Sequence, residues 1–161
     1  MSKPFGRGWS LDPSNWLALR AFLETSSLTW NRAVLAHAHR LSVPARPGVY
    51  AIEFPAPIQL GASSTVTCPP IRAPVYIGKS TTSIRMRFLS HTSDDPQDRI
   101  AKARAWPECS IGPRAFIWAE LDNARAIDTL ESLLIACFNP PCNKIGGVRL
   151  SEGRPAGALT P

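Results

Sequence analysis

Six residues with reactive or hydrogen-bonding side chains occur in order along the chain. They are Tyr50, Tyr76, Arg87, His91, Glu131 and Asn143. A phenol and an imidazole can transfer protons, a guanidinium binds anions through several donors, and a carboxylate is the hard oxygen ligand that Mg²⁺ prefers. This set suits chemistry on a charged ester assisted by a divalent cation. It requires helices and strands that bring the side chains together.

The arginine and the histidine are expected to lie side by side on one helix. A helix is predicted from 83 to about 90, because side chains recur there at the three-and-four spacing of one face. The residues on that face are Ile84, Arg87, Phe88 and His91. Arg87, rather than its neighbour Arg85, is therefore the arginine placed beside His91.

The glutamate interrupts the apolar stripe of another predicted helix, from about 124 to 138. The apolar members of this stripe are Ile127, Leu130, Leu134, Ile135 and Phe138. A carboxylate is seldom buried without a partner. Two interpretations of Glu131 stay open: it is a metal ligand, or it is a peripheral side chain that reaches water or an ion-pair partner.

Three strands are predicted around the tyrosines. Residues 48–54 alternate in the manner of a half-buried strand, with Tyr50 on its bulky apolar side. A second short strand covers 75–78, and 115–121 is apolar enough to be buried on both faces. Residues 55–74 are rich in Pro, Ser and Thr and are predicted to form an inserted loop.

The first 46 residues are predicted to form two helices. The first begins at Pro13 after Asp12, with an apolar stripe that consists of Trp16, Leu19 and Leu23. The second begins near 28 or 29 and ends before Pro44. Its apolar face consists of Trp30, Val34, Ala38 and Leu41.

A short charged helix is predicted near 97–105. It carries Arg99, Lys102 and Arg104. These residues are candidate phosphate contacts, and the alternative is an ordinary solvated helix. The tail 146–161, rich in Gly, Pro and Ala, is predicted to be flexible.

The net charge of the chain favours a polyanionic partner. Lys and Arg number 18 against 12 Asp and Glu, which gives +6 and a pI near 9.6. Nucleic acid and an anionic membrane surface both fit this charge. No stretch approaches the roughly 20 apolar residues of a spanning helix, and the N-terminus lacks a secretory signal, so a cytoplasmic protein is expected. The cysteines lack zinc-ligand spacing, and Cys137 suits a buried thiol.

The ordered motifs resemble those of the GIY-YIG nuclease family. They are Gly48-Val49-Tyr50, Tyr76-Ile77-Gly78, Arg87 with His91, Glu131 and Asn143, and the resemblance covers roughly 48–144. It implies an α+β nuclease domain at 48–145, with a three-stranded antiparallel sheet flanked by helices. Residues 1–47 would be an N-terminal helical extension. The long separation of the two tyrosines departs from the tight hairpin of many members.

The resemblance also implies roles for the site residues. Glu131 would hold one Mg²⁺ or Mn²⁺, Tyr50 would act as general base or relay, and Tyr76 would contact the phosphate or the water. Arg87 would bind the scissile phosphate, and His91 would hydrogen-bond Tyr50 or assist proton transfer. Asn143 would fix the backbone near Glu131 or reach the phosphate.

Three neighbouring residues complete the expected substrate contacts. Gly78 would allow close approach of the backbone, with an ordinary turn glycine as the alternative. Lys79 would help to lower the pKa of the Tyr50 phenol, which is otherwise about 10. Arg85 would contact the nucleic-acid backbone or serve as a surface charge.

The expected function is a metal-dependent endonuclease that hydrolyses DNA. RNA is an alternative substrate, and a nucleic-acid-binding module without catalysis is an alternative function. A third hypothesis is an interaction protein whose basic N-terminal helices bind a partner. The motifs leave the biological role, the specificity and the oligomeric state open.

Overall fold

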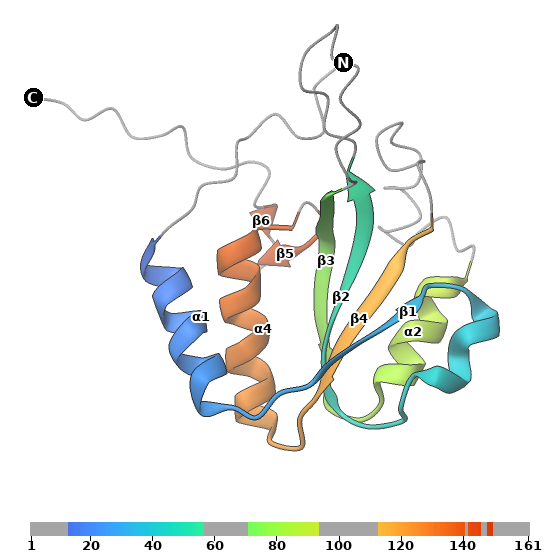
Figure 1. Ribbon diagram of the computed structural model, residues 1–161, viewed down its shortest axis with the longest axis horizontal. Coiled ribbons are helices and arrows are strands. Elements are labelled where there is room, and N and C mark those ends of the chain that lie inside the picture. Colours follow the sequence, from blue (N-terminus) through green and yellow to red (C-terminus); the bar gives the residue numbers. More distant parts are fainter. Residues whose placement is uncertain (1–12, 57–70, 94–112, 141, 146–147, 150–161) are drawn as a thin grey trace, which may run out of the picture.

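The computed structural model describes residues 13–56, 71–93, 113–140, 142–145 and 148–149. In chain order the elements are α1 (Pro13–Thr25), β1 (Trp30–Val34), the 3-10 helix η1 (His37–Ser42), β2 (Gly48–Ala56), β3 (Ile71–Ser80), α2 (Ile84–Thr92), β4 (Ala115–Glu120), α4 (Ala124–Phe138), β5 (Lys144–Ile145) and β6 (Val148–Arg149). One antiparallel sheet has the strand order β1-β4-β2-β3, and β5 pairs with β6. The fold is α+β, as predicted, with helices on both faces of the sheet (Figure 1).

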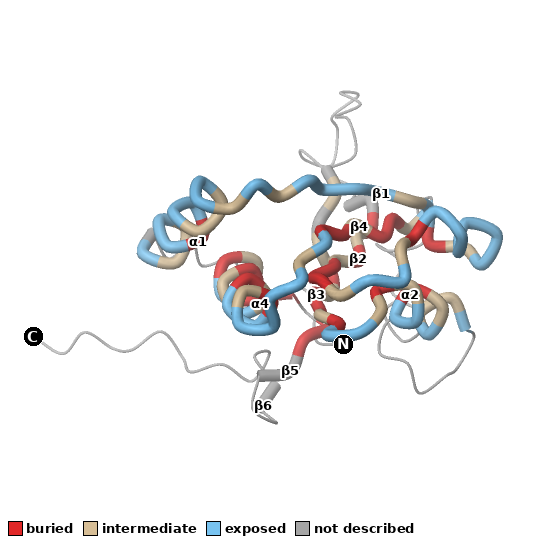
Figure 2. The backbone as a smooth tube through the Cα atoms, turned by 90° about the horizontal axis from the view of Figure 1, so that it is seen from below, coloured by how far each residue is buried: buried red, intermediate tan, exposed pale blue. Residues whose placement is uncertain are grey.

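Each face of the four-stranded sheet carries its own apolar cluster. On one face, Val49 of β2 and Ile77 of β3 pack with residues of α1 and α4. On the other face, Ile52 of β2 and Phe116 of β4 pack with Phe88 of α2. Figure 2 shows that burial is concentrated in the central strands and on one side of α4. We call the side that packs against α1 and α4 the α4 face, and the side that packs against α2 the α2 face.

The alternation predicted for the first tyrosine strand is confirmed. Tyr50, Ile52 and Phe54 lie in the cluster of the α2 face, whereas Val49 and Ala51 lie on the α4 face. Both tyrosine strands are longer than predicted, because antiparallel pairing of β2 with β3 continues as far as Ala56 and Ile71. The third strand, β4, is confirmed and is buried on both faces.

The second helix predicted in the N-terminal extension is wrong. Its residues form the strand β1 and the 3-10 helix η1, and β1 makes the sheet four-stranded instead of three-stranded. The predicted apolar face buries little: Trp30 is 39% exposed, Val34 41% and Leu41 73%. Pairing with the open edge of β4 satisfies backbone groups along Trp30–Val34, which outweighs a weak helical stripe.

The helix that carries Glu131 matches its prediction in type and bounds. The Asn123 side chain caps its start by accepting a hydrogen bond from the Ala126 N–H at 3.1 Å. At its end Asn139 adopts the left-handed conformation, with φ 43°, and its N–H donates to the Ile135 carbonyl at 2.8 Å. The apolar stripe is buried at Ile127, Leu130, Leu134 and Ile135. Packing of this stripe fixes Glu131 beside the sheet.

Two serines fix the start of α2 to the end of β3. The buried Ser80 side chain accepts a hydrogen bond from the Ser83 N–H at 2.9 Å. The Ser83 side chain in turn caps α2 by accepting from the Met86 N–H at 3.3 Å. The helix extends to Thr92 and therefore includes His91, slightly beyond its predicted end.

The segment before β2 is also fastened to α2. Arg85 Nε donates to the Val43 carbonyl at 2.7 Å. A Cβ atom on Gly48 would overlap the Ala119 carbonyl oxygen and lie 2.7 Å from Cδ1 of Ile84. Only glycine therefore allows β2 to pass so close to β4 and α2.

Several predictions fall outside the described residues. They concern the predicted helix near 97–105, most of the inserted loop and most of the tail, although Val148–Arg149 of the tail forms β6. Within the described residues, no helix combines the length and apolarity needed to cross a membrane.

Candidate active site

Three rings from three elements meet on the α2 face of the sheet. The Tyr50 hydroxyl of β2 lies 3.1 Å from Nε2 of His91 on α2. The ring of Tyr76 on β3 has its centroid 6.0 Å from that of Tyr50 and 5.4 Å from that of His91. The long insertion between the two tyrosine motifs therefore does not separate the phenols. The expected hydrogen bond between Tyr50 and His91 is present.

Gly78 leaves the space that the two phenols occupy. It pairs with Tyr50 across β2 and β3. A Cβ atom at Gly78 would lie 2.7 Å from both Cζ and the hydroxyl oxygen of Tyr50, and 2.8 Å from Cε1 of Tyr76. Any larger residue would push the reactive end of Tyr50 away from β3. The glycine of the second motif is thus a packing requirement of the site.

The Tyr50 ring is buried and stacked on a neighbouring aromatic ring. Only 2% of the residue is exposed, and its ring stacks on Phe116 with centroids 4.9 Å apart. Burial is the largest cause that raises the Tyr50 pKa above its ordinary 10.0, followed by interaction with Tyr76. The charge of Glu131 raises this pKa further, and that of Arg87 lowers it. The free protein therefore holds Tyr50 as a neutral phenol at neutral pH.

This raised pKa predicts a specific alkaline instability. Above about pH 10 Tyr50 ionises in the unfolded chain but keeps its proton in the folded protein, so folding loses about 1.4 kcal/mol per pH unit. The contribution is complete below that pH and is lost as the pH rises toward the folded pKa. Tyr50→Phe removes this loss. Urea denaturation at about pH 8, 10 and 11 is expected to show the variant gaining on the wild type only in the alkaline samples. Parallel curves would contradict a raised Tyr50 pKa.

Arg87 lies on α2 one turn before His91 and is exposed. Its positive charge lowers the pKa of the Tyr50 phenol, so the guanidinium lies within electrostatic reach of that hydroxyl. Arg85 has a different environment, because its Nε is bonded to the Val43 carbonyl. As predicted, Arg87 rather than Arg85 is the arginine one turn from His91 on α2.

Glu131 faces β3 from α4, on the other face of the sheet. Its Oε2 lies 2.8 Å from Nζ of Lys79, and its side chain is 17% exposed. Lys79 Nζ is also 2.8 Å from Oδ1 of Asp128. Asp128 and then Glu131 raise the pKa of Lys79 to about 12. Lys79 was expected to lower the Tyr50 pKa, but the neighbouring groups that shift this pKa are Tyr76, Arg87 and Glu131.

Asn143 reinforces β3 at the outer edge of the sheet. Its Oδ1 accepts a hydrogen bond from the Ile77 N–H at 2.8 Å, and its Nδ2 donates to the Ile77 carbonyl at 2.6 Å. The preceding Cys142 N–H donates to the Val75 carbonyl at 2.9 Å. Asn143 thus fixes backbone, but it is the backbone between Tyr76 and Gly78. Its side-chain amide makes the two hydrogen bonds that the backbone of a neighbouring strand would make to Ile77.

The groups lie on the two sides of β3, one of the two edge strands of the four-stranded sheet. The two tyrosines and His91 lie on the α2 face, and Lys79 and Glu131 lie on the α4 face. The adjacent residues Gly78 and Lys79 of β3 link the two sets along the strand. Arg99, Lys102 and Arg104 lie outside the described residues.

Sequence reasoning missed two residues of this site. Phe116 supports the Tyr50 ring, and Asp128 shares Lys79 with Glu131. The spacing of three between Asp128 and Glu131 on a helix was the available signal for the second. Phe116 carried no comparable signal, since its contact depends on strand pairing.

A divalent cation fits the donor set only if water and substrate supply most of its ligands. No three His, Cys, Asp or Glu residues are grouped in the described part of the chain. Glu131 offers one partly buried carboxylate, and Mg²⁺ is commonly bound by one or two carboxylates together with waters and phosphate oxygens. One Mg²⁺ or Mn²⁺ held by Glu131 is compatible with this donor set.

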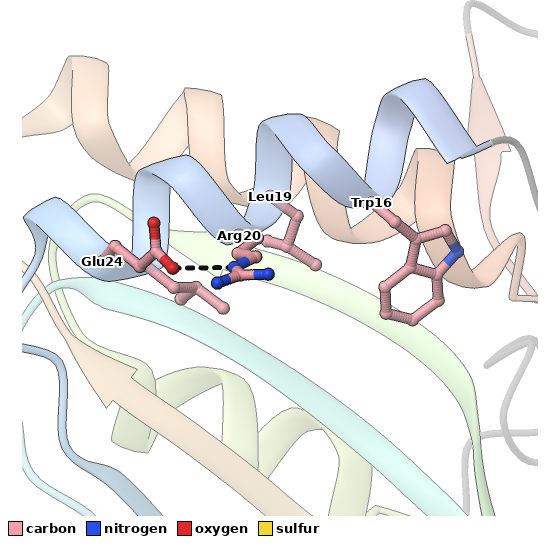
Figure 3. A pocket seen from close by; sticks show the side chains of 5 residues that line it. Trp16, Leu19, Arg20 and Glu24 are labelled. Carbon is pink, nitrogen blue, oxygen red and sulfur yellow. Dashed lines mark hydrogen bonds and ion pairs between the residues drawn. The ribbon is translucent and has the colours of Figure 1, made fainter.

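A separate pocket lies along α1 (Figure 3). Its volume is about 320 Å³, and its lining residues are Trp16, Leu19, Arg20, Leu23 and Glu24. Arg20 and Glu24 are bonded to each other at 2.7 Å across its rim. None of the site residues named above lines it.

In comparisons with known proteins, no family model, no curated protein and no solved structure matches the chain. A functional assignment must therefore rest on the ordered motifs and on the geometry around β3.

Proposed function

We propose that the protein is a metal-dependent endonuclease of the GIY-YIG type that hydrolyses phosphodiester bonds in DNA. The meeting of Tyr50, Tyr76 and His91 over Gly78 carries this proposal. An ordinary strand tyrosine needs a packed ring, but it does not need a second phenol and an imidazole at its hydroxyl. In this proposal β2, β3, β4 and α4 are the nuclease core, and β1 is an added edge strand.

Proton transfer would run from water through Tyr50 to His91. Because burial keeps the phenol neutral, Tyr50 can accept a proton from water only as its own proton leaves. Nε2 of His91, 3.1 Å from the hydroxyl, is within reach of that proton. Imidazole titrates near neutrality, so it can accept it. The products are a hydroxide in position for attack and an imidazolium, and Tyr50 is again neutral.

Positive charge on both faces of the sheet at β3 would offset the negative charge of the phosphate. Arg87 would bind the non-bridging oxygens through its planar guanidinium. Glu131 would hold the divalent cation, which when bound stabilises charge on the phosphoryl group and the departing oxygen. The net charge of +6 supports a nucleic-acid substrate.

The proposal is tested on supercoiled plasmid with the full chain. Wild-type protein with Mg²⁺ is expected to nick the plasmid, and EDTA is expected to prevent this. Glu131→Gln keeps the size of the side chain and is expected to abolish the metal-dependent nicking. Thermal denaturation serves as the control that the variant folds.

Two results would change the assignment. Plasmid binding without nicking across Mg²⁺ and Mn²⁺ would favour the non-catalytic nucleic-acid-binding module. Cleavage of RNA under conditions that leave DNA intact would replace the substrate and keep the chemistry.

A further inference from the structure

One ammonium group bridges two carboxylates at the α4 side of the site. Lys79 Nζ lies 2.8 Å from Asp128 Oδ1 and 2.8 Å from Glu131 Oε2. The two acids are three positions apart on α4, so they project from neighbouring turns. The Glu131 side chain is 17% exposed, against 60% for Asp128. Lys79 therefore has one inner partner and one outer partner.

Glu131, the inner partner, cannot bind the Lys79 ammonium and a divalent cation equally well at the same time. Lys79 Nζ already lies 2.8 Å from the Glu131 carboxylate. A divalent cation bound to the same carboxylate would therefore be close to the ammonium, and two positive charges repel strongly in a partly buried site. Loading a metal on Glu131 therefore requires Lys79 to weaken its contact with Oε2. Asp128 already holds the same ammonium from the solvent side.

We propose that Asp128 is a positioning residue that retains Lys79 when a divalent cation takes its place on Glu131. This inference rests on the proposed function and extends it to the loading of the metal. Lys79 exchanges two carboxylate partners for one, and its charge stays at the edge of β3. Asp128 acts through Lys79 and does not bind the metal itself.

The inference has a thermodynamic consequence. Without Asp128, Glu131 is the one carboxylate partner left to Lys79 among the described residues, so the metal must compete with a more firmly held ammonium. Without Lys79, this competition from the ammonium is removed. The two substitutions therefore change metal affinity in opposite directions.

The test is Mn²⁺ binding to the full chain in the absence of nucleic acid, followed by the electron paramagnetic resonance signal of free Mn²⁺. Asp128→Asn is expected to weaken binding about threefold, in line with the modest energy of a partly exposed ion pair. Asp128→Glu is expected to restore the affinity. Lys79→Met is expected to tighten binding about tenfold, since a like charge is removed beside the ion.

A double substitution separates positioning from a simple effect of charge. If Asp128 acts through Lys79, Asp128→Asn weakens binding less than about 1.5-fold in the Lys79→Met background. An equal or larger penalty there would overturn the inference, because Asp128 would then attract the metal directly. An unchanged affinity in Asp128→Asn would overturn it as well.

The Glu131→Gln variant distinguishes failure of the Asp128 positioning role from failure of the proposed function. If Glu131→Gln abolishes Mn²⁺ binding and the Asp128 variants do not alter it, only the positioning role is wrong. If Mn²⁺ binding is the same with and without the Glu131 carboxylate, the metal role of Glu131 is wrong and the inference falls with it.

Discussion

Arg87→Gln is expected to lower the rate of phosphodiester cleavage by about a thousandfold, the upper range for removing one preorganised group that stabilises charge in the transition state. Arg87 lies on α2 one turn from His91, and its charge acts at the Tyr50 hydroxyl. A guanidinium at this place can bind the phosphate as its charge develops. Since the side chain is exposed, the substitution leaves the core of the protein unchanged.

The measurement is a single-turnover rate at saturating DNA, which separates the chemical step from binding. Arg87→Lys is expected to recover only part of the rate, because an ammonium cannot make the two parallel bonds of a guanidinium. Arg125→Gln is a matched control, since Arg125 is an exposed arginine in the first turn of α4. It is expected to change the single-turnover rate less than twofold, consistent with about 0.5 kcal/mol or less for a surface substitution.

A different outcome would assign Arg87 a simpler role. If Arg87→Gln weakened DNA binding and its salt dependence but left the saturated rate intact, Arg87 would be a backbone contact only. In that case the positive charge at the transition state would have to come from elsewhere in the site.

Local patterns predicted the elements that pack by a simple period. In α4 the apolar residues recur every three or four positions, and the helix that they predict has the observed bounds, 124–138. In β2 the alternation of Tyr50, Ile52 and Phe54 with smaller residues predicted which side chains share the α2 face. In both cases the period of the sequence is the period of burial.

The strand β1 was beyond such reasoning. Trp30 and Val34 have the spacing of a helix face, but both are substantially exposed in the structure. The segment is a strand because β4 offers an unpaired edge, and that edge exists only after the chain has folded. A five-residue segment has too little local preference to resist such pairing.

The site was predictable as a set of residues but not as a geometry. The order of motifs selected Tyr50, Tyr76 and His91, but their contact depends on the register of β2 with β3. That register shifts between Ile52 and Glu53, next to the pair formed by Ile52 and Tyr76. A shift of one residue moves a side chain to the opposite face, so sequence alone did not fix the position of Tyr76.

Asn143→Ala is expected to have the largest effect on stability, about 2–4 kcal/mol, because it leaves two backbone groups of Ile77 without their partners. Asn143 is 9% exposed and Ile77 is 1% exposed, so water replaces these bonds poorly. For a chain of this size the melting temperature is expected to fall by about 5–15 °C. The loss of the β3 edge also releases Tyr76 and Gly78, so cleavage should fall below the rate expected from the folded fraction alone.

Asn143→Asp tests whether the loss is one of hydrogen bonding rather than of volume. The carboxylate can still accept from the Ile77 N–H, but at neutral pH its second oxygen faces the Ile77 carbonyl, where Nδ2 now lies at 2.6 Å. Repulsion raises the pKa of the introduced acid above its usual value of about 3.9. Its protonated form can donate to the carbonyl, so stability relative to the Asn143→Ala variant should rise as the pH falls through that raised pKa. Melting temperatures of the two variants from about pH 7 down to pH 4 measure this difference. A constant difference would show that the Ile77 carbonyl does not need the donor, and that Asn143 contributes mainly by filling space.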